Sequence, residues 1–194
     1  DSDAGVLLGS WLRQLPVGGR WHNFTYYRIS SDFGRTWTAP KQLRYEDGED
    51  FDPARPHHPG YLQRNNAYFG TSILRHSNGT LILPVAHANA VGDPSNDQRA
   101  WRMGSLCFIA KWGAAAKDYQ WTAGERVEIS PTVSSRGLME PDLIELNDGR
   151  WLLACEQWKD WDDPAPLHIR GYVLFSDNQG RTWGGRVDLP GSAD

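Results

Sequence analysis

The chain has 194 residues, with 20 Lys and Arg, 24 Asp and Glu, a formal net charge of −4 and 39% hydrophobic residues. This length fits one compact domain or a part of a larger one. The small negative charge excludes a sequence-independent nucleic-acid binder, which needs a basic face to displace counterions. The longest apolar runs are only a few residues, so we expect no membrane span.

Short β-like segments follow one another along the chain, and no segment has a convincing helical pattern. They are rich in Val, Ile, Leu and aromatic residues and are separated by Gly, Pro, Asn and Asp. The Asn78-Gly79 and Asp148-Gly149 pairs each lie between two such segments and predict tight hairpins, because both residues of each pair can adopt a positive φ. The expected strands are residues 5–12, 24–30, 71–76, 80–86, 105–112, 126–129, 142–146, 150–156, 171–176 and 186–189.

These hairpins belong to a longer repeat. Residues 71–86 (TSILRHSNGTLILPVA) parallel residues 141–156 (PDLIELNDGRWLLACE), and each hairpin is followed by a polar stretch, a strand, a turn and a last strand. We therefore divide the chain into units at about 3–44, 69–129 and 137–189, of which the first is incomplete. A repeating unit of four antiparallel strands is typical of a propeller blade. The sequence predicts an all-β fold, a β-propeller of four-stranded antiparallel blades.

One turn motif occurs twice, in residues 30–37 (SSDFGRTW) and 176–183 (SDNQGRTW), with the common pattern S-x-[DN]-x-G-x-T-W. The Asp or Asn can accept backbone hydrogen bonds within the turn, the Gly supplies a conformation closed to other residues, and the Trp is an apolar anchor. We assign these structural roles to Asp32, Gly34, Trp37, Asn178, Gly180 and Trp183. The middle unit keeps only an outline of the motif, in which Trp121 leads into the expected strand 126–129.

The motif resembles the Asp box, or BNR repeat, of sialidases (neuraminidases), whose propeller has six blades. The resemblance implies that residues 1–194 are about three blades of a partial propeller domain, with the missing blades as a partner. It also implies that the complete protein is an exo-α-sialidase-type glycoside hydrolase that removes terminal sialic acid or a related sugar from glycans, without a cofactor. Such a protein is expected to be secreted, periplasmic or extracellular.

All the longer connections of such a meander fall on one face, which here collects residues 14–23, 45–68, 87–104, 130–137 and 157–170. Function usually resides on long loops over a rigid scaffold, so we expect the glycan site on this face. An arginine there could bind a carboxylate through two hydrogen bonds, and a tryptophan could stack on a sugar, although a surface charge or a packed loop would give the same pattern. The candidate substrate-binding residues are Arg13, Arg136, Arg170, Glu156, Trp158, His57 and His58.

Glu140 is the candidate catalytic residue, because it stands just before the inner strand 142–146, close to the expected propeller axis. A carboxylate at such a place is expensive to desolvate unless it is paired or used. The segment 140–150 (EPDLIELNDGR) resembles the sialidase segment whose first Glu assists a nucleophilic Tyr. That family also uses an Arg triad for the substrate carboxylate and an Asp as general acid/base, with retention at the anomeric carbon. The structural alternative is a Glu that bridges loop donors.

Three departures from the family keep other functions open. Glu156 stands where the family usually has a triad arginine, so either Arg170 has taken over this role or the substrate is not a sialoside. The first long loop has no Asp or Glu, and Tyr172 lies within an expected strand, where packing fits better than reactivity. The alternatives are a non-catalytic carbohydrate-binding propeller and a glycosidase or lyase that uses the same scaffold for a different sugar.

The two cysteines, Cys107 and Cys155, lie in apolar runs and are read as buried thiols in strands. A disulfide between them would require neighbouring strands. Neither belongs to a Cys or His cluster with metal-ligand spacing, so we expect no metal site.

Overall fold

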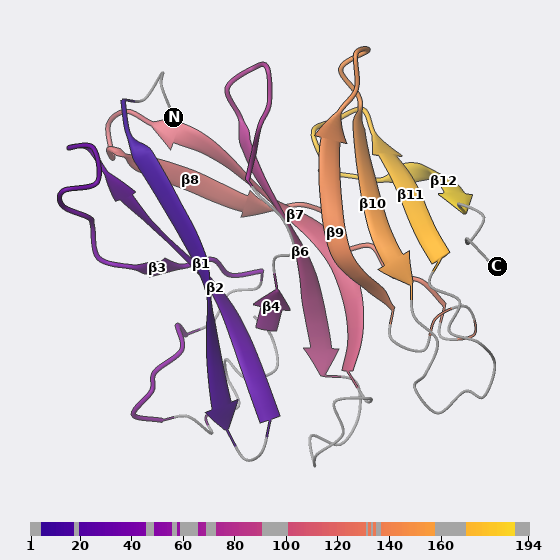
Figure 1. The fold of residues 1–194 in the computed structure, drawn as a ribbon, viewed down its shortest axis with the longest axis horizontal. Coiled ribbons are helices and arrows are strands. Elements are labelled where there is room, and N and C mark those ends of the chain that lie inside the picture. The colour runs from indigo at the N-terminus through magenta and orange to yellow at the C-terminus, as the bar shows by residue number, and fades with distance from the viewer. Residues whose placement is uncertain are drawn as a thin grey trace.

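A computed structural model describes residues 5–17, 20–45, 49–55, 58, 66–68, 73–90, 101–130, 132, 134, 137–157 and 170–188, and all of its regular structure there is β. The strands form three antiparallel sheets, which lie side by side in Figure 1. The first sheet contains β1 (Leu7–Val17), β2 (Arg20–Ser30) and β3 (Lys41–Gln42). The second contains β4 (Asn66–Tyr68), β5 (Leu74–Arg75), β6 (Leu81–Ala90), β7 (Trp101–Gly113) and β8 (Asp118–Ala123). The third contains β9 (Leu138–Glu145), β10 (Trp151–Gln157), β11 (Arg170–Ser176) and β12 (Gly184–Asp188).

Chain order is also the order within the sheets, as expected of a meander. The third sheet has the strand order β12-β11-β10-β9, and the second has β4-β6-β7-β8 with β5 also paired to β6. Among the described residues, the first sheet has the strand order β1-β2-β3, with β1 at one edge. The structure thus confirms the all-β antiparallel prediction for the described part of the chain.

The two predicted hairpins are present and have the same geometry. In the first, the amide of Gly79 donates to the carbonyl of His76 (2.9 Å) and the amide of His76 donates to the carbonyl of Thr80 (2.8 Å). The second repeats these bonds around Gly149. Positive φ occurs only at the glycines, Gly79 (85°) and Gly149 (82°), so each loop is a turn followed by a glycine bulge and not a turn with two left-handed residues.

Strand boundaries differ from the sequence prediction in two informative places. Residues 14–17 and 20–23 belong to paired strands and not to a loop, because β1 and β2 pair from Leu7↔Ser30 to Val17↔Arg20. The last strand of the second sheet is β8, with Tyr119 buried and Gln120 exposed, whereas the expected strand 126–129 makes only an isolated bridge between Val127 and Ser105. Alternation of polar and aromatic residues marked β8, but it carries few of the aliphatic residues used to find strands.

The second sheet is the centre of the described molecule because both of its faces are buried. Ile82 and Cys107 pack toward the third sheet, while Leu83 and Leu106 pack toward the first. Burial on both faces explains why β6 and β7 read as nearly continuous apolar runs. Each such side chain stabilises the fold by about 1.5–3 kcal/mol relative to exposure.

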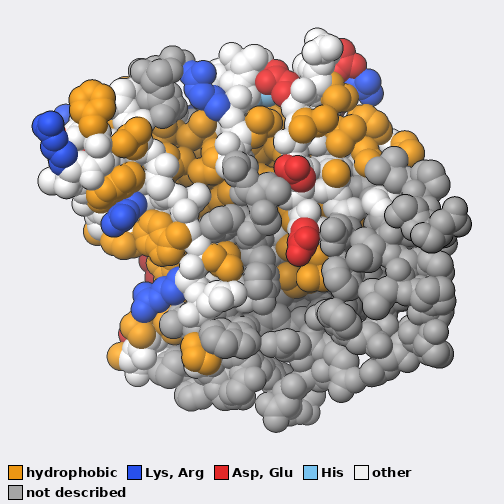
Figure 2. Space-filling view, viewed as in Figure 1, with side chains coloured by type: hydrophobic (Ala, Val, Ile, Leu, Met, Phe, Trp, Pro, Cys, Tyr) orange, Lys and Arg blue, Asp and Glu red, His pale blue; other side chains and the backbone are white. Residues whose placement is uncertain are grey.

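The first and third sheets also carry apolar side chains away from the second sheet. Leu7 on β1 is 43% exposed, Ile144 on β9 is 50% exposed and Val187 on β12 is 45% exposed. Figure 2 shows hydrophobic side chains at the surface both over the first sheet on the left and over the third sheet on the right. No helix among the described residues is long and apolar enough to cross a membrane.

Candidate functional site

The repeated turn motif joins the same positions by hydrogen bonds in both copies. In the first copy, the amide of Thr36 donates to Oδ1 of Asp32 (2.8 Å) and its hydroxyl donates to Oδ2 (2.6 Å), while Gly34 donates to Oγ of Ser30 (2.8 Å). The Thr36 hydroxyl, the Thr36 amide and the Ser30 hydroxyl lower the pKa of Asp32 to about 2. All the hydrogen bonds described for this carboxylate lie within its own turn, as expected of a structural residue.

In the second copy an asparagine replaces the aspartate and keeps the geometry. The amide of Thr182 donates to Oδ1 of Asn178 (2.9 Å), and Nδ2 of Asn178 donates to the Thr182 hydroxyl (2.6 Å). Gly180 donates to Oγ of Ser176 (2.8 Å), as Gly34 does in the first copy. The threonine hydroxyl therefore reverses its direction between the two turns, as donor in one and acceptor in the other.

The motif tryptophans pack in different ways. Nε1 of Trp37 donates to the carbonyl of Gly34 (3.1 Å), and the Arg28 guanidinium lies 4.7 Å from the centre of the Trp37 ring. Trp183 packs against the core between the second and third sheets, and its amide donates to Glu125 (3.0 Å). The second copy thereby fastens the third sheet to the segment that leaves β8.

The candidate site lies at the opposite end of the sheets from the hairpin tips. In Figure 1 the β5–β6 and β9–β10 tips point to the top of the view, while β1, β6 and β10 end toward the bottom. The register Gln157↔Leu138 and Gln157↔Arg170 brings the start of β9, the end of β10 and the start of β11 together at that lower end.

Glu140 lies within β9, in a β-bulge, and not before the strand as the sequence suggested. Asp142 pairs with Ala154 while Met139 pairs with Glu156, so Glu140 and Pro141 together oppose one residue of β10. The φ of Glu140 is 46°, a left-handed conformation that costs about 1–3 kcal/mol outside glycine and is further disfavoured before proline. Bulges of this kind redirect a side chain and often lie next to active sites.

The Glu140 side chain is exposed in the described structure. This carboxylate is in contact with solvent in the described part of the chain, and the desolvation expected from the sequence stays a prediction for the complete protein. Glu140 is distinguished by its backbone, because glycine would adopt this positive φ at a lower cost in free energy.

The start of β9 is fixed against the second sheet by an unusually close approach. Gly137 bridges Met103 on β7, and a Cβ at Gly137 would lie 1.9 Å from the Met103 carbonyl oxygen. The hydroxyl of Ser134 donates to the Gly137 carbonyl (2.8 Å), and that of Ser105 donates to the Leu138 carbonyl (3.4 Å). These contacts fix the backbone at Gly137 and Leu138, just before Glu140 in the chain.

The other candidate residues are placed unevenly. Glu156 and Arg170 occupy backbone positions at the same end of the third sheet as Glu140, through the pairs Glu156↔Met139 and Gln157↔Arg170. His58 is half-buried, and its amide donates to the carbonyl of Arg55 (3.0 Å) in a turn. Arg136, Trp158 and His57 lie outside the described residues.

Arg13 is not gathered with these residues by any contact in the described part of the chain. Its guanidinium lies 5.8 Å from the centre of the Phe51 ring, on the aromatic face of the first sheet that Phe24, Tyr26 and Phe51 form. The expectation of a long loop from residue 14 onward placed Arg13 at a loop edge, whereas the structure places it within β1.

A buried arginine that sequence reasoning missed lies between the first and second sheets. The Arg126 side chain is 6% exposed and pairs with Glu128. Its Nε donates to Nδ1 of His87 (3.0 Å) and its Nη2 to the His87 carbonyl (3.1 Å), while the His87 ring packs on Tyr45 at 4.7 Å. Gly104 makes room for the guanidinium, since a Cβ there would lie 2.6 Å from Cζ. A glycine inside a strand was the one signal of this contact.

Both thiols are free and buried, in agreement with the simpler prediction for them. Burial raises the pKa of both, to about 12 for Cys155, so neither is a nucleophile near neutral pH. Among the described residues, no group of His, Cys, Asp and Glu side chains is arranged to hold a metal ion.

Comparison with solved structures identifies the fold. A crystal structure of a protein of unknown function from Dyadobacter fermentans aligns with a TM-score of 0.62 and 16% identity over 95% of this chain and 47% of its own. The microbial sialidase Hz136 aligns with a TM-score of 0.51 and 13% identity over 94% of this chain and 30% of its own. The fold is sialidase-like.

The sialidase-like fold is all that these similarities show, because identities of 13% and 16% carry no information about activity. No protein-family model and no curated protein sequence matches this chain. The chain spans about half the length of the first neighbour and less than a third of the second.

Proposed function

We propose that the three sheets are consecutive blades of a six-bladed sialidase-like propeller, and that the complete protein is a secreted, periplasmic or extracellular glycoside hydrolase of the exo-α-sialidase type. The observation that carries this proposal is the bulge at Glu140, a strained acidic position at the expected loop end of a sialidase-like fold. Strain of this kind concentrates at functional sites because folding stability alone does not select it.

The partial propeller is supported by the two outer faces of the described sheets. Leu7 on the first sheet and Ile144 and Val187 on the third sheet are exposed apolar side chains that a neighbouring blade would cover. In this proposal the missing strand of the first blade and about three further blades complete the ring, so that no sheet is left with an open apolar face.

The proposed chemistry follows the sialidase resemblance and assigns only what this chain offers. Glu140 accepts a hydrogen bond from a tyrosine of another blade and makes that hydroxyl a better nucleophile toward the anomeric carbon. Arg170, at the start of β11, is the candidate partner for the sugar carboxylate through two parallel hydrogen bonds. Glu156, one residue before the end of β10, orients this arginine or a sugar hydroxyl. Arg136, Trp158, His57 and His58 remain candidate glycan contacts.

A fluorogenic sialoside tests this proposal on the complete protein. Release of 4-methylumbelliferone is expected, and Glu140→Gln is expected to lower kcat at least a hundredfold with an unchanged melting temperature. Asp142→Asn, two residues along the same strand and also exposed, is the matched control and should retain turnover. Equal turnover of Glu140→Gln and the wild type would remove Glu140 from the site.

A non-catalytic carbohydrate-binding propeller is the second candidate function. The exposed Glu140 carboxylate and the acidic Glu156 at the position of a family arginine favour it. Glycan binding by the complete protein without detectable hydrolysis of any sialoside would decide for this candidate. Turnover of a different glycoside would instead indicate a glycosidase or lyase for another sugar.

A further inference from the structure

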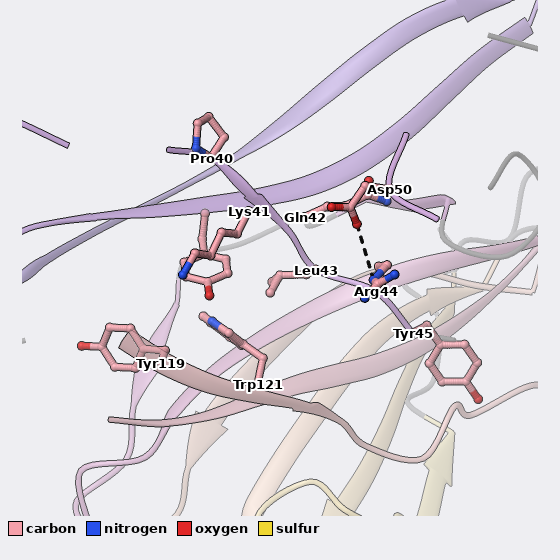
Figure 3. A pocket seen from close by; sticks show the side chains of 10 residues that line it. Pro40, Lys41, Gln42, Leu43, Arg44, Tyr45, Asp50, Tyr119 and Trp121 are labelled. Atoms are coloured by element: carbon pink, nitrogen blue, oxygen red, sulfur yellow. Dashed lines mark ion pairs between the residues drawn. The ribbon is translucent and has the colours of Figure 1, made fainter. Parts of the chain in front are cut away.

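A groove of about 480 Å³ lies between the first and second sheets, far along the chain from Glu140. One side is the segment 40–45, which contains β3, and the other side is β8. Figure 3 shows Trp121 on the β8 side, opposite Lys41 and Leu43. The volume falls within the range of about 300–1,000 Å³ that is usual for ligand pockets.

Aromatic side chains form the β8 wall of the groove. The rings of Tyr27 and Trp121 lie 5.4 Å apart, and those of Tyr119 and Trp121 lie 6.2 Å apart. Tyr27 and Tyr119 are buried, whereas Trp121 keeps part of its surface accessible. Trp121 is therefore the accessible ring of this wall, and Tyr45, also partly buried, lines the groove as well.

The rim of the groove carries Lys41, Arg44 and Asp50, which take part in two ion pairs. Lys41 pairs with Asp118, which also accepts the Tyr27 hydroxyl at 3.3 Å, and Nε of Arg44 lies 3.5 Å from Oδ1 of Asp50. The side chains of Lys41 and Arg44 are 51% and 39% exposed, so solvent reaches both pairs. The four charges cancel, and the rim presents hydrogen-bond donors and acceptors side by side.

We propose that this groove is a binding site for a neutral saccharide, separate from the glycan site at the loop end. A sugar hydroxyl donates and accepts at once, so neighbouring hydroxyls match a rim that holds both cations and a carboxylate. The apolar face of a sugar ring matches the accessible face of Trp121. The proposal does not depend on the catalytic activity of the protein.

Charge and polarity disfavour the other ligand classes. An anion would have to displace Asp118 from Lys41 or Asp50 from Arg44, so the groove has no unbalanced positive charge to attract it. A purely apolar ligand would cover exposed ion pairs without replacing their hydrogen bonds to water. A polyhydroxylated neutral ligand covers the rim and the aromatic wall without either cost.

Titration calorimetry of the complete protein with lactose, cellobiose and maltose tests the site, with 3′-sialyllactose as an acidic comparison. We expect at least one neutral disaccharide to bind with a dissociation constant of about 1 mM. The double variant Lys41→Ala/Arg44→Ala should weaken this binding about tenfold without a change in melting temperature. Lys111→Ala, which removes an exposed cation on β7 outside the groove, should leave binding unchanged.

Three results would overturn the proposal: no binding of any of the three neutral disaccharides, binding that the double variant does not weaken, or at least tenfold tighter binding of 3′-sialyllactose that depends on Lys41 and Arg44. Trp121→Phe provides a second readout, since a smaller ring should weaken binding while the fold is retained by its remaining aromatic contacts. Binding unaffected by either variant would belong to another part of the protein.

Discussion

Nε2 of His76 on the second sheet lies 3.0 Å from Oε1 of Glu145 on the third. Nδ1 of His76 accepts a hydrogen bond from the Asn78 amide (3.1 Å), and this contact orients the imidazole so that Nε2 lies toward Glu145. The hydroxyl and amide of Ser77 donate to the same carboxylate at 2.6 and 3.0 Å. The tip of the β5–β6 hairpin is thus hydrogen-bonded to the end of β9, the first strand of the third sheet.

Removal of the Glu145 carboxylate should destabilise the chain mainly at pH values above the pKa of this carboxyl group. The Ser77 hydrogen bonds and the nearby His76 lower the pKa of Glu145 below its usual 4.5, so its contribution is complete above about 4.5 and is lost as pH falls below that value. We expect Glu145→Ala to lower the free energy of unfolding by about 1 kcal/mol near neutral pH. Urea unfolding at about pH 7 and about pH 3 measures it, and Asp177→Asn is an exposed control. An equal loss at both pH values would contradict this account.

The first turn motif should tolerate asparagine but not alanine at Asp32. Asn178 already makes the equivalent bonds in the second copy, where the threonine hydroxyl accepts instead of donating. Asp32→Asn should therefore change the melting temperature by at most about 1 °C near neutral pH, whereas Asp32→Ala should lower it by several degrees. Calorimetry of both variants measures this difference.

The pH dependence of the Asp32 variants provides the control. The pKa of Asp32 is lowered from 3.8 to about 2, so its stabilisation is present above about 3.8 and is lost as pH falls toward 2. The advantage of wild type over Asp32→Asn should not grow as the pH is lowered. A wild type that keeps its full advantage over Asp32→Ala at about pH 2 would show that the carboxylate does not act through these hydrogen bonds.

Alanine substitutions at Gly137 and Gly149 provide a matched test of the close contact between the second and third sheets. Both have a left-handed φ, of 81° and 82°, but only Gly137 faces backbone, with 1.9 Å between a Cβ and the Met103 carbonyl oxygen. Gly149→Ala should cost about 1 kcal/mol from backbone strain alone, and Gly137→Ala at least about 3 kcal/mol. Chemical unfolding compares them, and equal costs would show that this close approach is not required.

Some of these elements could be predicted from the sequence and others could not. The hairpins at Gly79 and Gly149 and the two S-x-[DN]-x-G-x-T-W turns could be predicted because short-range hydrogen bonds and positive φ decide them within a few residues. The sequence predicts the last strand of the second sheet at residues 126–129 instead of at β8, because β8 consists mainly of aromatic and polar residues. The length of the β1–β2 hairpin was missed because polar residues such as Gln14 and Asn23 occupy paired positions.

The candidate site was less predictable, since it depends on contacts between sheets. No local pattern in the sequence predicts that Arg126 lies on Gly104 and His87, because these residues meet only when the segment after β8 continues along β7. The bulge at Glu140 likewise arises from the pairing with β10, and no spacing within residues 137–143 encodes it. Resemblance to a family motif points to Glu140, but nothing in that motif predicts the positive φ of this residue.

Replacing Glu140 by glycine should separate stability from function. Glycine adopts a φ of 46° without the clash of a Cβ, which offsets its larger loss of backbone entropy on folding, about 0.5–1 kcal/mol. We expect Glu140→Gly to raise the free energy of unfolding by about 1 kcal/mol, whereas Glu140→Ala should leave it nearly unchanged. Urea unfolding of both variants measures this, with turnover or glycan binding of the same variants in parallel.

The combination of the two readouts decides what the strained position does. A more stable and inactive Glu140→Gly is the outcome expected of a residue kept for function at a cost in stability. A more stable variant with unchanged turnover and glycan binding would reduce Glu140 to a residue that the bulge merely tolerates. A less stable variant would mean that the Glu140 side chain itself supports the bulge, which would favour the structural alternative of a Glu that bridges loop donors.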